Sequence, residues 1–231
     1  MLNNVDIDSF IDIGCGAGEL ACSLAEKGFK GVGSDFSISA IKTANKLKKD
    51  RNIKDSQLRF YIEDSKKIKT QKHDLVICCE VLEHIKDDRS LLKNLKKNSN
   101  KYLLLSVPAK QRLFDASDAA VGHFRRYEKD SFLELLNSEG LEVLSFATYG
   151  YPFTNLVRIL RKILFRIKFS KNKSETMEDR SKESGINPVK LPSTLTCIDL
   201  ETVLKPFYGF SLLFNRFNLS EGYLVLCKKK K

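Results

Sequence analysis

The segment FIDIGCGAGEL, residues 10–20, places Gly14, Gly16 and Gly18 directly after a short apolar run. Glycine adopts left-handed backbone conformations at little cost and lets a ligand approach the chain closely. A helical pattern follows the loop, and Asp35 ends the next apolar run, about where an acidic residue binds ribose hydroxyls in nucleotide-binding α/β proteins. Because Glu19 follows Gly18, the spacing is not that of the dinucleotide fingerprint. The segment predicts a strand, a turn and a helix that bind a nucleoside-containing ligand.

The chain alternates short apolar runs with helical patterns as far as residue 149, which is typical of a parallel α/β sheet. Gly28 and Gly140 follow two of the helical patterns, as glycines that end helices do. We expect a Rossmann-like doubly wound sheet of seven strands, with an antiparallel last strand and a helical insertion before it. The expected strands are 9–13, 31–34, 58–62, 74–79, 102–107, 141–146 and 222–227, and the expected helices are 18–28, 38–50, 87–98 and 129–139.

Three regions follow from this pattern. Residues 1–150 form the ligand-binding α/β core, and residues 151–220 form a helical and loop insertion that acts as a lid or an interface. Residues 221–231 hold the last strand and a lysine tail. A chain of 231 residues fits one domain of ordinary size with such an insertion.

The net charge of +11 gathers in the C-terminal part of the chain, at residues 153–173 and 228–231. The sequence has no apolar run long enough to span a membrane, and its polar, acidic beginning is unlike a secretory leader. The cysteines lack the paired spacing of metal ligands, so we expect reduced thiols, no metal site and a cytoplasmic protein. They are Cys15, Cys22, Cys78, Cys79, Cys197 and Cys227.

Acidic residues follow or end several of the expected strands. In a doubly wound sheet these strand ends meet at one edge, where ligands bind. Carboxylates there would oppose the two phosphates of a dinucleotide, whereas a sulfonium nucleoside with an ammonium group suits them. The acids concerned are Asp12, Asp35, Asp64 and Glu80.

The segments DIGCGAG, EDS (63–65) and HDLVICCEVLEHI (73–85), together with Asp35, resemble class I S-adenosylmethionine-dependent methyltransferases of the small-molecule, ubiquinone-biosynthesis-like group. The resemblance implies that the glycine loop lines the methionine and ribose parts, that Asp35 takes the ribose hydroxyls and that Phe36 lies against adenine. An alternative for Asp64 is a helix N-cap, and for Glu80 and Glu83 it is exposed charge. The residues implied to contact the cofactor are Asp12, Gly14, Cys15, Gly16, Gly18, Asp35, Phe36, Asp64, Ser65, Cys79 and Glu80.

The connection 108–128 is longer than packing requires, and such loops are commonly functional. Its GHFRRY segment also resembles a stretch of an uncharacterised bacterial branch of the same superfamily. We expect His123, with His84 after the fourth strand, to be the catalytic residues, as base or substrate ligand. His73, at the other end of that strand, is expected to be structural. Substrate binding is assigned to Arg125, Arg126 and Tyr127; alternatively, the arginines pair with Asp115 and Asp118 and fix the loop.

Residues 153–169 predict a basic amphipathic helix. We favour a lid over the site or a homodimer surface, because the segment is tied to the core at both ends. The alternative is peripheral contact with an anionic membrane.

The sequence therefore predicts an S-adenosylmethionine-dependent methyltransferase that acts on oxygen or nitrogen of a small metabolite, lipid-linked or glycosidic ones included. One alternative is a nucleic-acid methyltransferase, although the Asn/Asp-Pro-Pro-aromatic tetrad is absent after the fourth strand. A dehydrogenase is disfavoured by the glycine spacing and the acidic edge. A further alternative is a protein of the same fold that binds the cofactor or a membrane without turnover.

Overall fold

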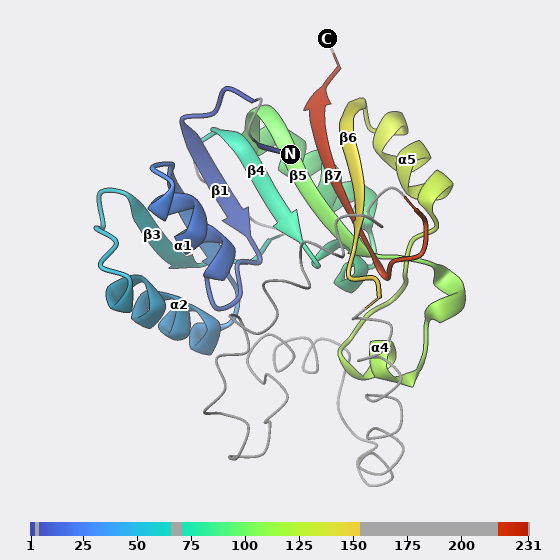
Figure 1. The fold of residues 1–231 in the computed structure, drawn as a ribbon, viewed down its shortest axis with the longest axis horizontal. Helices are drawn as coiled ribbons and strands as arrows, with labels where there is room; N and C mark the ends of the chain where they lie inside the picture. The colour runs from blue at the N-terminus through green and yellow to red at the C-terminus, as the bar shows by residue number, and fades with distance from the viewer. Residues whose placement is uncertain (3–4, 66–70, 153–216, 231) are drawn as a thin grey trace, which may run out of the picture.

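The computed structural model describes residues 1–2, 5–65, 71–152 and 217–230. Within these residues the chain builds one mixed sheet of seven strands (Figure 1). The strands are β1 (Ser9–Ile13), β2 (Lys30–Asp35), β3 (Leu58–Ile62), β4 (His73–Cys79), β5 (Ser99–Pro108), β6 (Leu141–Tyr149) and β7 (Gly222–Lys229).

The strand order across the sheet is β3-β2-β1-β4-β5-β7-β6. The first five of these pair in parallel, whereas β7 runs antiparallel to both β5 and β6. The sequence-based predictions of seven strands and of an antiparallel last strand are confirmed. The C-terminal strand enters the sheet between two earlier strands and does not lie at its edge.

Helices cover the sheet and separate two apolar cores. One core joins the sheet to the first two α-helices, and the other joins it to the third and fifth. The helices are α1 (Glu19–Glu26), α2 (Ile38–Asp50), α3 (Asp88–Asn98), α4 (Ala116–Ala120) and α5 (Lys129–Ser138), with the short 3-10 turns η2 (Leu82–His84) and η3 (Gln111–Leu113).

The centre of the sheet is buried on both faces, as a parallel strand between helices must be. Alternate residues of β4 show this directly. Leu75 and Ile77 belong to the core under α1 and α2, whereas Val76 and Cys78 belong to the core under α3 and α5. This explains the nearly continuous apolar run that predicts the strand.

The strand directions bring the functional segments to one end of the sheet, where the parallel strands finish; we call this end the strand edge. Because β1, β2, β4 and β5 are parallel, Ile13, Asp35, Cys79 and Pro108 end them on the same side. The reversed β7 begins at this edge, where Gly222 pairs with Pro108 and with Tyr149, the last residue of β6.

Several expectations are refined by the structure. Strand β5 begins earlier than expected and β6 ends later, at Tyr149. The connection 108–128 is not a bare loop, because it contains η3 and α4. The expected helix 153–169 lies outside the described residues, so the lid, dimer and membrane interpretations stay predictions. No helix in the described part of the chain has the length and apolar character needed to cross a bilayer.

Phe132 of α5 is fully buried and packs against Tyr127, with ring centroids 5.2 Å apart. We expect Phe132→Ala to lower the free energy of unfolding by about 3–5 kcal/mol, because the cavity cannot fully close. Phe217, which is 57% exposed, provides the matched control. Chemical denaturation of both variants tests this; equal losses would contradict the packing described.

Candidate cofactor and acceptor site

The glycine loop turns sharply between β1 and α1. The backbone N–H groups of Gly14 and Cys15 both donate to the carbonyl oxygen of Ser34, at 2.8 and 3.0 Å, and the N–H of Gly18 donates to the carbonyl of Cys15 at 2.9 Å. All three glycines have positive φ, of 74°, 53° and 83° along the chain. A residue with a side chain would be strained in such a turn.

The three glycines differ in what surrounds them. A Cβ on Gly14 would lie 2.4 Å from a methyl of Val81, and one on Gly18 would lie 2.7 Å from the ring of Phe60. These two glycines permit internal packing. A Cβ on Gly16 would meet no atom within 4 Å, so Gly16 faces open space. Of the three, only Gly16 has open space where its side chain would be.

Asp35 ties this loop to the next helix. One carboxylate oxygen accepts from the N–H of Gly16 at 3.0 Å and the other accepts from the N–H of Ser37 at 2.8 Å. Ser37 in turn caps α2 through the N–H of Ala40. Next to Asp35, the ring of Phe36 is 41% exposed, although large apolar side chains are usually covered.

Asp12 lies at the centre of this edge and is buried. Burial, with a smaller contribution from the charge of Asp35, raises the pKa of Asp12 to about 7. Burial also raises the pKa values of the Cys15 and Cys79 thiols, that of Cys79 to about 12, so both thiols are neutral at physiological pH. The chemistry at the centre of the edge is therefore that of a carboxyl group and not of a reactive thiolate.

Asp64 and Ser65 follow the end of β3. Asp64 is exposed, and the carbonyl of Ser65 accepts from the side chain of Asn94 at 3.1 Å. The N-cap alternative for Asp64 concerns a helix over residues outside the described part of the chain, so it stays open.

Glu80 follows β4 with a positive φ of 55°, a conformation that costs free energy in a residue with a side chain. Its N–H donates to the carbonyl of Ser106, and its Oε1 accepts from the Ser106 hydroxyl at 2.8 Å and from the hydroxyl of Tyr149. The ring of Tyr149 crosses Gly222, where a Cβ would lie 2.2 Å from Cζ. Tyr149 was not among the expected site residues, because the strand was expected to end at residue 146 and β6 extends to Tyr149.

His84 and His123 meet beyond the end of β4, where η2 contacts the 108–128 connection. Their rings make an edge-to-face contact with centroids 4.6 Å apart. Burial and the neighbouring His123 lower the pKa of His84 to about 4. Both histidines follow the carboxyl ends of strands, at the end of the sheet where the sequence predicts the site, and their catalytic role stays a prediction.

Glu83 lies between the two histidines, with its Oε1 3.9 Å from Nε2 of His123 and 4.0 Å from Nε2 of His84. It is fully buried, so its interpretation as exposed charge is wrong. Helix turn η2 folds the side chain inward beneath the 108–128 connection, whose Phe124 N–H donates to the Glu83 carbonyl at 2.8 Å. The ligand-type atoms of Glu83, His84 and His123 all lie within 4.8 Å of one another, close enough to hold a metal ion.

A buried ion pair fixes the position of His123. Asp118 accepts from the guanidinium of Arg126 at 2.7 and 2.9 Å and pairs with Nδ1 of His123 at 3.1 Å. It also accepts from the N–H of Asp115 at 2.9 Å. Burial alone would raise the pKa of Asp118, but the bonds from His123 and Arg126 hold it below its ordinary value.

Arg125 and Tyr127 anchor the same connection to the start of α3. Both donate to Oδ2 of Asp88, at 2.8 and 2.9 Å, and Arg125 also donates to the carbonyl of Lys86 at 2.7 Å. Of the two predicted pairings of the arginines, Arg126 with Asp118 is present, whereas Arg125 pairs with Asp88 and not with Asp115. All three predicted substrate-binding residues thus have intramolecular partners, and their role toward substrate stays a prediction.

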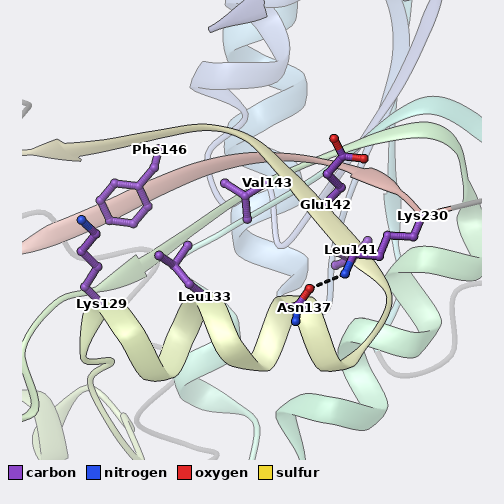
Figure 2. Close-up of a pocket in the computed structure, with 8 residues that line it drawn as sticks. All are labelled: Lys129, Leu133, Asn137, Leu141, Glu142, Val143, Phe146 and Lys230. Carbon is purple, nitrogen blue, oxygen red and sulfur yellow. Dashed lines mark hydrogen bonds between the residues drawn. The ribbon is translucent and has the colours of Figure 1, made fainter.

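A hollow of about 450 Å³ lies away from this edge, between α5 and β6 (Figure 2). None of the predicted site residues lines it. Its lining residues are Lys129, Leu133, Asn137, Leu141, Glu142, Val143, Phe146 and Lys230.

We expect Arg126→Ala to lower the free energy of unfolding by about 3–5 kcal/mol, because it leaves the carboxylate of Asp118 buried without its ionic partner. Arg125→Ala breaks a more exposed pair and is expected to cost about 1 kcal/mol or less. Denaturant titration of the two variants makes the comparison. Equal losses of unfolding free energy in the two variants would contradict the role described for the ion pair between Arg126 and Asp118.

Comparison with known proteins finds relatives of this chain. A curated relative, the ubiquinone biosynthesis O-methyltransferase of Rickettsia conorii, is 36% identical over 100 residues, which are 42% of this chain. The matched stretch spans about a third of that relative, 33% of its length.

Two solved structures share the fold. Magnesium protoporphyrin IX methyltransferase from Synechocystis PCC 6803, solved with bound SAH, is 25% identical with a TM-score of 0.54 over 62% of this chain and 68% of that one. The [4+2]-cyclase SpnF is 13% identical, with a TM-score of 0.63 over all of this chain and 77% of that one. The sequence model described as a methyltransferase domain matches residues 3–146, more than half of the chain. The chain therefore belongs to the methyltransferase-domain family.

Proposed function

We propose that the protein is an S-adenosylmethionine-dependent methyltransferase that acts on an oxygen or nitrogen atom of a small metabolite. The observation that carries this proposal is the strand edge itself, where the open backbone at Gly16 lies beside the buried carboxyls of Asp12 and Asp35. Membership in the methyltransferase-domain family supports the same reaction.

The residues at the edge fit the proposed cofactor. Gly16 leaves room for a ligand against the chain, and the nearby acids suit a molecule with sulfonium and ammonium charges. We assign Asp35 to the ribose hydroxyls and the exposed ring of Phe36 to adenine. Asp64 and Ser65 would bind the adenine edge, and the remaining predicted contacts, from Asp12, the glycine loop, Cys79 and Glu80, would surround the methionine part. When bound, the cofactor supplies an activated methyl group.

The acceptor is expected to approach from the side of His84 and His123. Methyl transfer from a sulfonium requires alignment of the acceptor with the methyl group, exclusion of water and, for a hydroxyl acceptor, removal of a proton. The two imidazoles supply groups that can interact with that proton, and Asp118 orients one of them. The name of the Rickettsia relative supports oxygen as the acceptor atom.

The same fold also occurs in a protein described as a cyclase, so the fold alone does not fix the reaction. Lipid-linked substrates, contact with a membrane through residues 153–169 and a homodimer remain proposals. Transfer to nucleic acid is motivated only by the net charge, which gathers at residues 153–173 and 228–231 of the sequence.

Cofactor affinity is expected to depend on the ionisation of Asp12. The ionised form attracts a cationic ligand. Among the described residues, the titratable groups that interact with Asp12 are Asp35 and the thiols of Cys15, Cys78 and Cys79, whose raised pKa values keep them neutral. Below pH 7, near the raised pKa of Asp12, this carboxyl group is mostly protonated and must lose its proton to bind the cationic cofactor. Affinity for S-adenosylmethionine should therefore rise on the order of tenfold from pH 5.5 to pH 7.0.

Isothermal titration calorimetry over this pH range measures the effect. Asp12→Asn is the control. Its side chain at position 12 does not titrate, so this variant should bind the cofactor more weakly and without the pH dependence that Asp12 causes. A wild-type profile as flat as that of the variant would contradict the assignment.

The proposed reaction is tested with methyl-labelled S-adenosylmethionine and a host extract separated into lipid, small-molecule, protein and nucleic-acid fractions. Label is expected in the small-molecule or lipid fraction. Label in nucleic acid would overturn the substrate class, and tight cofactor binding without label in any fraction would favour a protein without turnover.

His123→Ala should reduce labelling at least 100-fold while leaving the affinity for S-adenosylmethionine unchanged, since proton transfer contributes about 10²–10⁴ in rate. His73→Ala is the matched control, because His73 begins β4 at the opposite edge of the sheet. Unchanged labelling in His123→Ala would remove His123 from the acceptor side.

A further inference from the structure

The hollow between α5 and β6 lies outside the proposed methyl-transfer site (Figure 2). Its volume of about 450 Å³ falls among those of small-molecule sites, which are about 300–1,000 Å³. Lys129, Leu133 and Asn137 of α5 all line it. Because a helix rises about 1.5 Å per residue, the first and last of these positions are about 12 Å apart. The hollow therefore has the length to hold an elongated ligand.

The floor of the hollow is apolar. It is formed by Leu133 of α5 with Val143 and Phe146 of β6, and we call these three side chains the apolar floor. Each of them is only partly buried. Large apolar side chains are usually covered, and covering them with an apolar ligand is favourable because it removes their surface from water.

Three lysines, Lys96, Lys229 and Lys230, meet at one end of the hollow, at the start of β6. The Nζ of Lys96 would lie 3.4 Å from a Cβ on Gly140, whose carbonyl accepts from the backbone N–H of Lys230 at 3.0 Å. Lys229 pairs with the residue after Gly140 in the ladder between β6 and β7. Burial, followed by the charges of Lys72 and Lys96, lowers the pKa of Lys229.

These three ammonium groups bond to neutral oxygens. Lys230 donates to the side-chain oxygen of Asn137, and the other two donate to the backbone carbonyls of Glu139 and Ser99. Within the described part of the chain, no carboxylate forms an ion pair with any of them. Helices α3 and α5 end nearby. A helix C-terminus carries only about half a negative charge, so the two ends offset about one of the three positive charges.

The other charges of the hollow already have partners. Glu142, the acid among the lining residues, lies 3.3 Å from Nζ of Lys228. At the far end, the ammonium group of Lys129 lies over the ring of Phe146, 5.1 Å from its centroid, in a cation–π contact. The uncompensated positive charge is therefore at the Lys230 end, with the apolar floor beside it. A molecule with an anionic head and an apolar chain is complementary to this arrangement.

We propose that the hollow binds a single-chain anionic amphiphile of the fatty-acid type, with its carboxylate beside Lys230 and its chain along the apolar floor. The carboxylate supplies the negative charge that the lysines lack, and the chain covers the half-buried apolar side chains.

This site is separate from the strand edge. Leu141 pairs with the last residue of β7 at the Lys230 end, whereas Tyr149, at the strand edge, pairs with the first. The carboxylate would thus bind at the opposite end of the sheet from the cofactor. Its binding does not depend on the proposed function.

The test uses the purified full chain without cofactor and compares two probes that have the same alkyl chain and opposite head groups, decanoate and decyltrimethylammonium. Calorimetry is carried out below the concentrations at which they form micelles. One decanoate per chain is expected, bound more tightly than the cationic probe by on the order of tenfold and weakened by salt. Acetate, which lacks the chain, should not bind measurably. Equal binding of the two amphiphiles, or no binding of decanoate, would overturn the proposal.

Variants locate the site. Lys230→Glu should weaken decanoate binding by on the order of tenfold or more, because it places a carboxylate beside the head group. Leu133→Asp should weaken it by burying a charge in the apolar floor. Lys42→Glu is the matched control, since Lys42 is exposed on α2, and it should bind as the wild type does.

Circular dichroism checks that each variant is folded. Lys230 is exposed, so Lys230→Glu carries the test if Leu133→Asp does not fold. Unchanged affinity in Lys230→Glu would place the carboxylate elsewhere and overturn the proposal.

Vesicles of phosphatidylglycerol distinguish a free amphiphile from a lipid headgroup. Sedimentation with the vesicles and no binding of decanoate would assign the lysines to an anionic membrane and overturn the proposal. Decanoate binding that is lost in Lys230→Glu and kept in Lys42→Glu would support it, and would do so even in a protein without methyl transfer. A failure of the proposed function is therefore distinguishable from a failure of this site.

Discussion

The region around His84 and His123 depends on the buried ion pair between Asp118 and Arg126. A buried pair of this kind adds little net stability compared with apolar packing, but removing one partner is costly. It is retained here in a position where it fixes geometry, because Asp118 also holds His123. The anchoring of Arg125 and Tyr127 to Asp88 serves the same purpose from outside. The connection 108–128 is therefore held in place at two points, which a long loop needs if it carries chemistry.

The cofactor side is built differently, from backbone groups and short local contacts. The glycine loop, Asp35 and the start of α2 are joined by hydrogen bonds to main-chain N–H groups. Such an arrangement is encoded within a few residues of each strand end. Because of this difference, one part of the site could be predicted from the sequence and the other part could not.

The sheet and the cofactor side were predictable because their signals are local. Apolar runs predict the strands, and glycines with a following acid predict the loop at Gly16. The strand ends were less certain, and Tyr149 was missed because β6 extends past its apolar residues. The interior position of β7 was also beyond the sequence pattern, since it depends on pairing between distant segments. For Glu83, exposed surface charge was an open alternative, because the three residues of η2 are too few for helical periodicity to show which side is covered. The pairing of Arg125 with Asp88 and the burial of Glu83 depend on the three-dimensional course of the 108–128 connection.

The ring of Tyr149 has a consequence for how the sequence can vary. It lies over Gly222 of β7 and reaches the carboxylate of Glu80 beyond β5, so it crosses the sheet from β6 to the end of β4. A side chain at position 222 would need the same space as the ring. The two positions are thus exclusive: a bulky residue at one excludes a bulky residue at the other. Among relatives that keep this strand order, positions 149 and 222 should covary: where position 149 holds a small residue, position 222 can hold a residue larger than glycine.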